Sequence, residues 1–237
     1  MSARAGKRPV RAALFDLDGT LVDSEIHTDT AIRAVAERHG VEGFGLPHTE
    51  TRGRTWAHVA GVMRERAGIA ADPEGLADEL LAYWMDIAAD VTPVPGAPEA
   101  IREAASSLPL GVVSSSPRAV IDSFLAKLGI ADCIGTAARI GGDAVHRSKP
   151  DPEGYLKGAS ALGAAPADCL VFEDSQAGLL AAKAAGMRSM FVRCCAADVE
   201  ANTALATASC TDYRSLPPNF WQRLAGGSLE LDGQVYA

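Results

Sequence analysis

The most constraining feature of this sequence is a repeated alternation of short apolar runs with amphipathic helical stretches. The helical stretches cover residues 98–107, 118–128, 152–162 and 176–185. The apolar runs have the length and composition of buried strands and cover residues 10–15, 110–113, 169–172 and 189–192, with a weaker candidate at 133–136. This alternation is typical of a parallel sheet with helices on both faces. Because crossover connections are right-handed, the sequence predicts a doubly wound α/β core.

One segment interrupts the alternation. Between Ser24 and Thr92 there is no strand-like run, but there are helical stretches at 30–39, 56–67 and 76–89, and a Pro-rich piece then returns the chain to the core. We therefore predict a smaller all-helical domain at 24–93, inserted after the first strand into a core formed by 1–23 and 94–237. The tail after about Ala196 shows no clear pattern.

Composition narrows the classes of function. The 237 residues carry a formal net charge of -8, which argues against a nucleic-acid partner because phosphate backbones are bound by clustered Lys and Arg. No apolar run reaches the ~20 residues that span a membrane, and the N-terminus has no signal-peptide core, so we expect a cytoplasmic protein without a membrane partner. The five cysteines include no CxxC pair, which argues against a zinc site.

Two carboxylates follow the first apolar run. Asp16 and Asp18 are two residues apart at the end of the predicted strand and precede Gly19, which permits a sharp turn. Two carboxylates ~4 Å apart repel by about 4 kcal/mol at an effective dielectric of 20, so a cation or a proton has to offset them. The pair alone is also compatible with an ordinary turn at a strand end.

Three more polar positions follow other apolar runs or their loops. Ser114 follows the run at 110–113 and could hold a phosphate oxygen or cap a helix, and Ser116 before Pro117 looks like an N-cap. Lys149 lies in a Pro-stiffened loop, where it could neutralise an anion or simply be solvated. Glu173 and Asp174 end the run at 169–172 and suit a hard cation such as Mg²⁺, or a helix cap. Because strand ends converge at one edge of a parallel sheet, these residues could meet.

Taken together, these positions resemble the haloacid dehalogenase superfamily, in particular its phosphatases and β-phosphoglucomutases with a helical cap. The four motifs of that family appear in order as DLDGT (16–20), Ser114, Lys149 and ED (173–174). Members that cleave carbon–halogen bonds typically lack the second aspartate, which is present here as Asp18. Phosphonatases of the family use a cap lysine, and residues 24–92 contain no lysine. The resemblance therefore favours a phosphatase.

The resemblance also implies roles for individual residues. Asp16 would be the nucleophile that forms an aspartyl-phosphate, and Asp18 would be the acid/base, with Thr20 orienting it. Mg²⁺ would be held by Asp16, the Asp18 backbone carbonyl and Asp174, and Glu173 would support metal-bound water. Phosphate would be held by Ser114, Ser115 and Lys149.

The substrate implied is a small phosphorylated metabolite, such as a sugar phosphate or a phosphoglycolate-like compound, and we expect a monomer or weak dimer. In the helical insertion, Arg52, Arg54 and Trp56 are candidates for substrate contact, or for solvated arginines and a core tryptophan. A sugar phosphate mutase stays an alternative, although the position where such mutases have an arginine is occupied here by Trp56. A non-catalytic metabolite-binding protein is a remoter alternative, because none of the four motifs is broken.

Overall fold

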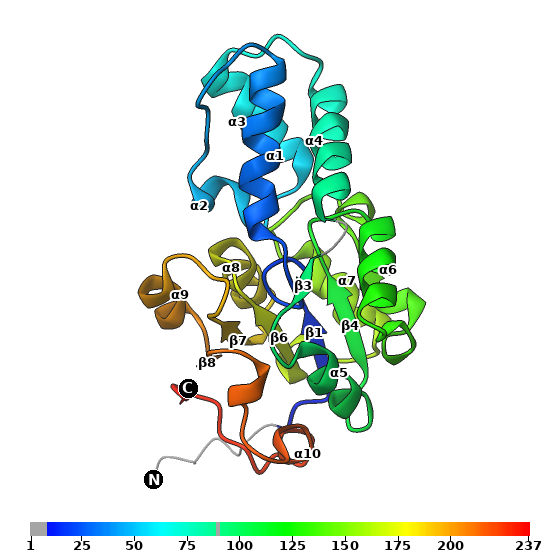
Figure 1. Ribbon diagram of the computed structural model, residues 1–237. Coiled ribbons are helices and arrows are strands. Elements are labelled where there is room, and N and C mark those ends of the chain that lie inside the picture. The colour runs from blue at the N-terminus through cyan, green and yellow to red at the C-terminus, as the bar shows by residue number, and fades with distance from the viewer. Residues whose placement is uncertain (1–8, 89–90) are drawn as a thin grey trace.

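The computed structural model describes residues 9–88 and 91–237 (Figure 1). Its main sheet has seven strands in the order β5-β4-β1-β6-β7-β8-β9, and all neighbouring pairs are parallel. The strands are β1 (Ala12–Phe15), β4 (Leu110–Val113), β5 (Arg139–Ile140), β6 (Cys169–Glu173), β7 (Arg188–Val192), β8 (Ala208–Cys210) and β9 (Val235–Tyr236). The predicted doubly wound α/β core is thus confirmed.

The order of the strands makes β1 the point at which the winding direction reverses. The chain adds β4 and then β5 on one side of β1, and afterwards adds β6 to β9 on the other side. In open α/β sheets, ligands bind in the crevice at the carboxyl ends of the strands beside such a reversal. The residues that follow β1, β4 and β6 therefore lie where this architecture forms its sites.

Helices cover both faces of the sheet. One face packs against α5 (Ala97–Ala105), α6 (Arg118–Lys127) and α10 (Phe220–Ala225), and the other against α7 (Glu153–Ala161) and α8 (Gln176–Ala184). Successive side chains of β1 point to opposite faces of the sheet. Phe15 therefore packs in the apolar cluster on the first face, and Leu14 packs in the cluster on the second. Strands buried on both faces appear in the sequence as continuous apolar runs, which is why they could be predicted.

Four helices, α1 (Glu25–Arg38), α2 (His48–Thr51), α3 (Trp56–Ala67) and α4 (Pro73–Ile87), stand together at the top of Figure 1. They have an apolar core of their own, which includes Val35, Val59 and Leu80. The two chain crossings between this unit and the sheet run side by side as the antiparallel pair β2 (Val22–Asp23) and β3 (Thr92–Pro93). We call this helical unit the cap. The domain boundaries at 24 and 93 remain a prediction.

One expectation about strands needs correction. Residues 133–136 run from the end of a short 3₁₀ turn at Ala131–Cys133 to the start of the next at Thr136–Ala138, and the edge strand β5 follows at Arg139–Ile140. Only Ile134 of that run inserts into the core, so the run has no strand-like alternation. The tail, which showed no pattern in the sequence, contributes β8, β9, α10 and the helix α9 (Val199–Leu205).

The tail is held to the core by aromatic packing. The ring centroid of Trp221 in α10 lies 5.3 Å from that of Phe172 and 6.1 Å from that of Phe15. The rings of Phe15 and Phe172 are themselves stacked at 4.8 Å between the two central strands. The tail is therefore part of the hydrophobic core beneath the strand ends.

Across residues 9–88 and 91–237, no helix combines the length and the apolar character needed to cross a bilayer.

Replacing Trp221 by Ala is expected to lower the free energy of unfolding by about 3–5 kcal/mol, because it removes a fully buried indole and leaves a cavity. Urea unfolding followed by circular dichroism measures this loss. Val235→Ala, at a side chain that is 54% exposed in the same tail, is the control and should change the free energy by less than about 0.5 kcal/mol. Equal stability of the two variants would show that the tail does not contribute to the core.

Candidate active site

The polar residues that follow β1, β4 and β6 lie together at the carboxyl edge of the sheet. Asp16 directly follows β1 and is hydrogen-bonded through its backbone N–H to the Phe172 carbonyl at 3.0 Å. Ser114 directly follows β4, and Glu173 is the last residue of β6. The Lys149 side chain reaches this edge from the loop before α7. The buried members of the group are Asp16, Ser114, Lys149, Glu173 and Asp174.

Lys149 links the ends of three strands. Its ammonium group contacts Asp16 Oδ1, donates to Glu173 Oε1 at 2.6 Å and donates to the Val113 carbonyl at 3.1 Å. Burial lowers the pKa of Lys149, but the carboxylates of Asp16 and Glu173 outweigh this effect and raise it above its usual range. Lys149 is therefore a cation at all physiological pH values.

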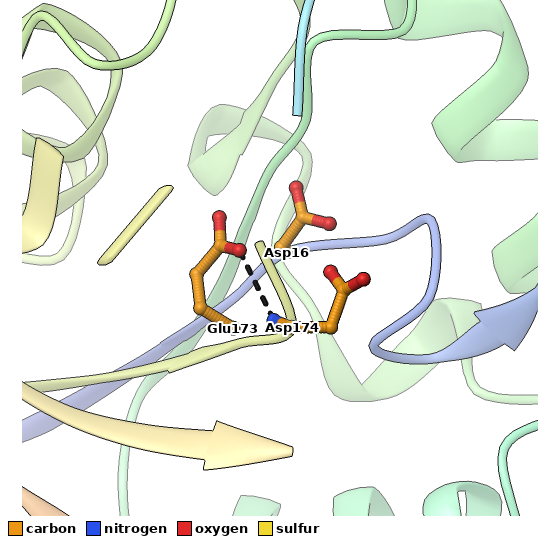
Figure 2. Close-up of side chains that lie close together, drawn as sticks. All are labelled: Asp16, Glu173 and Asp174. Atoms are coloured by element: carbon orange, nitrogen blue, oxygen red, sulfur yellow. Dashed lines mark hydrogen bonds between the residues drawn. The ribbon is translucent and has the colours of Figure 1, made fainter. Parts of the chain in front are cut away.

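Both carboxylate oxygens of Glu173 are engaged by protein donors. Oε1 accepts from Lys149 and from the Tyr155 hydroxyl at 2.6 Å. Oε2 accepts from the Asp174 N–H at 3.1 Å, which Figure 2 marks with a dashed line, and from the N–H and hydroxyl of Ser175. Glu173 thus orients Lys149 and the backbone turn that carries Asp174. The Ser175 hydroxyl also caps α8, as expected for one residue of this turn, by accepting from the Gly178 N–H at 3.1 Å.

Asp18 is held by three hydroxyl groups. Ser24 donates to Oδ1 at 2.7 Å, and Ser116 and Ser114 donate to Oδ2 at 2.9 and 3.3 Å. Burial raises the pKa of Asp18, while the hydrogen bonds from these hydroxyls partly lower it. The net increase favours the protonated form of this carboxyl relative to a solvated aspartate, as a proton donor requires.

Two expectations about the surroundings of Asp18 are wrong. Thr20 donates to Asp174 Oδ1 at 3.3 Å instead of orienting Asp18. Ser116 does not cap α6, whose N-cap is Pro117, because its hydroxyl is turned toward Asp18. The contacts of Ser24 and Tyr155 were not anticipated, since no local sequence signal separates them from other serines and tyrosines.

Three buried carboxylates form a group that could hold a metal ion. Oxygen atoms of Asp16, Glu173 and Asp174 lie within 4.8 Å of one another (Figure 2). Beside them Gly19 has a φ of +76°, and a Cβ at this position would lie 2.2 Å from Asp174 Oδ2. Carboxylate oxygens are the ligands that hard cations prefer. Lys149 contacts two of the three carboxylates, and the group offers only oxygen ligands, so the donor set fits a hard divalent cation.

A loop of the cap lies against the core beside these residues. Arg52 donates to the Cys195 carbonyl, and its Nη1 is 3.9 Å from Asp174 Oδ2. The Gly53 carbonyl accepts from the Ser115 hydroxyl at 2.7 Å, and Arg54 Nη1 donates to the Lys149 carbonyl at 2.9 Å. The cap is therefore closed over the strand ends, and Ser115 contacts the cap as well as lining the site.

The cap and core enclose a pocket above the two aspartates. The pocket is partly open to solvent, and about 410 Å³ of its space, open solvent included, is free of protein atoms. Asp16, Asp18, Ser115 and Ser116 line it from the core. The cap contributes Thr28, Thr51, Gly53, Arg54, Trp56, Val59 and Trp84. Arg54 and Trp56 thus lie in the pocket, whereas Arg52 lies beside a neighbouring cavity that Asp174 also lines.

Comparison with known proteins agrees with this geometry. Residues 10–186 match the model of the haloacid dehalogenase-like hydrolase family. The chain is 40% identical to validoxylamine A 7'-phosphate phosphatase of Streptomyces hygroscopicus subsp. limoneus, over 75% of this chain and 83% of that protein. It is 36% identical to hexitol phosphatase A of Escherichia coli, over 73% of this chain and 78% of that protein.

The fold is also similar to that of a solved β-phosphoglucomutase from Clostridium difficile. The TM-score is 0.76 at 23% identity, and the match covers 92% of this chain and 97% of the other. At this identity the likeness concerns the fold. The family match and the phosphatase relatives establish the class of the chain: it belongs to the haloacid dehalogenase-like hydrolases and is a phosphoric monoester hydrolase.

Proposed function

We propose that this chain is a Mg²⁺-dependent phosphatase that hydrolyses a small phosphorylated metabolite, such as a sugar phosphate, through an aspartyl-phosphate on Asp16. The observation that carries this proposal is the contact of Asp16 with the Lys149 ammonium group beside the pocket that both Asp16 and Asp18 line. Two relatives are named as phosphatases of a validoxylamine phosphate and of hexitol phosphates, which supports a polyhydroxylated substrate.

The chemistry has two steps in this proposal. An oxygen of Asp16 attacks phosphorus in line, the bond to the leaving oxygen breaks, and Asp18 gives its proton to the leaving alcohol. Asp18, now a carboxylate, then takes a proton from a water molecule whose oxygen attacks the phosphoryl group and releases Asp16 with inorganic phosphate. The three hydroxyls around Asp18 support this role because they fix the orientation of the carboxyl group.

A magnesium ion would be held by the carboxylates of Asp16 and Asp174, together with the Asp18 carbonyl. Glu173 is the less suitable ligand, because both of its oxygens already accept hydrogen bonds from protein groups. When bound, the ion would neutralise the phosphoryl oxygens and the nucleophile. Lys149 supports the same effect through its contact with Asp16, since its charge reduces the repulsion between carboxylate and phosphate.

Asp16→Asn should lower turnover of any phosphoester by at least about 1,000-fold, because the amide cannot form the covalent intermediate. The rate of phosphate release from a panel of phosphorylated metabolites measures this loss of turnover. The control is Asp132→Asn, at an exposed aspartate, which should keep wild-type turnover. Ordinary turnover by Asp16→Asn would refute the proposed nucleophile.

The mutase alternative is tested by giving β-glucose 1-phosphate to the wild-type protein. Formation of an isomer without release of phosphate would indicate a mutase instead of a phosphatase.

Removal of divalent cations with EDTA should abolish phosphatase activity, and added Mg²⁺ should restore it. Mg²⁺ should also raise the midpoint of thermal unfolding of the wild type, since a ligand that binds only the native state stabilises it. This rise should be smaller in Asp174→Asn, which removes one proposed ligand. Full activity in EDTA, or the same rise in both proteins, would contradict the metal site.

The position of Glu173 can be tested through its neighbour Gly178. A Cβ at Gly178 would lie 1.7 Å from Glu173 Oε1, so Gly178→Ala has to displace the carboxylate that holds Lys149 and the Asp174 turn. We expect about a 10- to 100-fold loss of phosphatase activity, as for other residues that orient metal ligands.

The matched control is Gly61→Ala, also in a helix, where a Cβ would meet nothing within 4 Å. It should keep full activity and raise the free energy of unfolding by about 0.4–1 kcal/mol. Wild-type activity of Gly178→Ala would show that the position of Glu173 does not matter for catalysis.

A further inference from the structure

A buried hydrogen-bond donor without a partner lines the pocket beneath the cap. Trp84 in α4 is 1% exposed, and its indole Nε1 has no hydrogen-bond partner within residues 9–88 and 91–237. Leaving a buried donor unsatisfied costs about 1–3 kcal/mol, so such a group in a native protein needs an explanation. The pocket supplies one, because Trp84 lines it together with Asp16 and Asp18.

The ring of Trp84 is fixed by aromatic neighbours from both parts of the protein. Its centroid lies 5.8 Å from that of Trp56 in the cap and 5.7 Å from that of Phe124 in α6, with an edge-on orientation toward Phe124. Packing against these two rings restricts the orientation of the indole. Because Trp84 lines the pocket, a polar group that enters the pocket can reach this ring and accept its hydrogen bond.

A second donor lies at the same pocket. Arg54 uses Nη1 to bind the Lys149 carbonyl, but its buried Nε has no hydrogen-bond partner in the part of the chain that the structure describes. Trp56 and Val59 add apolar surface. The described cap residues that line the pocket include no carboxylate. The cap side of the pocket thus offers N–H donors, the hydroxyls of Thr28 and Thr51, and apolar faces, which suit a leaving group with oxygen acceptors and an apolar face.

We propose that Trp84 is a specificity-determining residue whose indole N–H donates a hydrogen bond to a hydroxyl oxygen of the leaving group. The inference rests on the proposed function, because phosphorus has to lie at Asp16 for the leaving group to occupy the remainder of the pocket. A site built to hydrogen-bond a substrate hydroxyl discriminates strongly against a substrate that lacks it, since the buried donor is then left unpaired. Phosphate esters of polyols should therefore be preferred over esters that have no hydroxyl group.

The test compares a hexitol phosphate with phenyl phosphate, whose leaving group offers no hydroxyl in addition to the ester oxygen. Trp84→Phe keeps an aromatic ring between Trp56 and Phe124 and removes only the N–H donor and part of the ring. We expect kcat/KM for the hexitol phosphate to fall about 5- to 150-fold, as for a lost hydrogen bond of 1–3 kcal/mol, and kcat/KM for phenyl phosphate to change less than about 3-fold. Trp221→Phe makes the same change outside the pocket and should leave the ratio of the two values unaltered.

The outcomes separate this inference from the proposed function. Equal losses for both substrates, or no loss for either, would overturn the role of Trp84 while leaving the phosphatase intact. A wild-type enzyme that hydrolyses other phosphorylated metabolites of the panel but not the hexitol phosphate would also overturn the role of Trp84. Failure to release phosphate from any member of the panel would overturn the proposed function and the inference with it.

A measurement on the intact indole covers the case in which Trp84→Phe does not fold. In ¹⁵N-labelled Asp16→Asn protein, the three tryptophan indole N–H signals can be assigned through Trp56→Phe and Trp221→Phe. Addition of the hexitol phosphate should move the Trp84 proton signal downfield, whereas phenyl phosphate should not. An unchanged Trp84 signal with bound hexitol phosphate would overturn the inference.

Discussion

The buried cluster of charges around Lys149 is the interaction on which the rest of the active site depends. The ammonium group is taken out of water and is compensated by Asp16 and Glu173, which come from neighbouring strands. The register of β1 and β6 pairs Phe15 with Phe172, and this places the two following acidic residues side by side. Removing one partner from such a cluster leaves a buried charge unpaired, which typically costs 3–5 kcal/mol. The sheet register and the chemistry are therefore coupled.

The same cluster explains why the acidic residues have different roles. Glu173 is saturated with hydrogen bonds and acts as a fixed support, whereas Asp16 faces both Lys149 and the pocket. Asp18 accepts hydrogen bonds from hydroxyl groups and not from the ammonium group. Burial raises the pKa of both Asp16 and Asp18, and the direct contact with Lys149 opposes this increase at Asp16. Environments that differ in this way allow one carboxyl group to be a nucleophile and another a proton donor.

The cap is held against the core largely by hydrogen bonds from side chains to main-chain carbonyl groups. Arg52 and Arg54 donate to carbonyls of two separate core loops, and Ser115 donates to the carbonyl of Gly53 between them. A Cβ at Gly53, whose φ is +68°, would lie 2.5 Å from Ser175 Oγ, so a glycine permits this close approach. The cap is thereby brought close enough for Trp84 to pack against Phe124 of the core.

The sequence by itself determined the parallel α/β core, because strands buried on both faces are continuous apolar runs. Polar residues at the strand ends of such a sheet can converge, and the resemblance to a known family identified Asp16, Asp18, Ser114, Lys149 and Glu173–Asp174 as one site. The sequence did not reveal β8, β9 and α10, because these elements are short and show no clear hydrophobic periodicity. Their place in the core depends on packing, such as that of Trp221 on Phe15 and Phe172. Nor did it give the partners of Asp18 or the place of Trp84 in the pocket. Those depend on distances between residues far apart in the chain, such as Ser116 and Asp18 or Trp84 and Phe124, and only the packing of cap on core decides them.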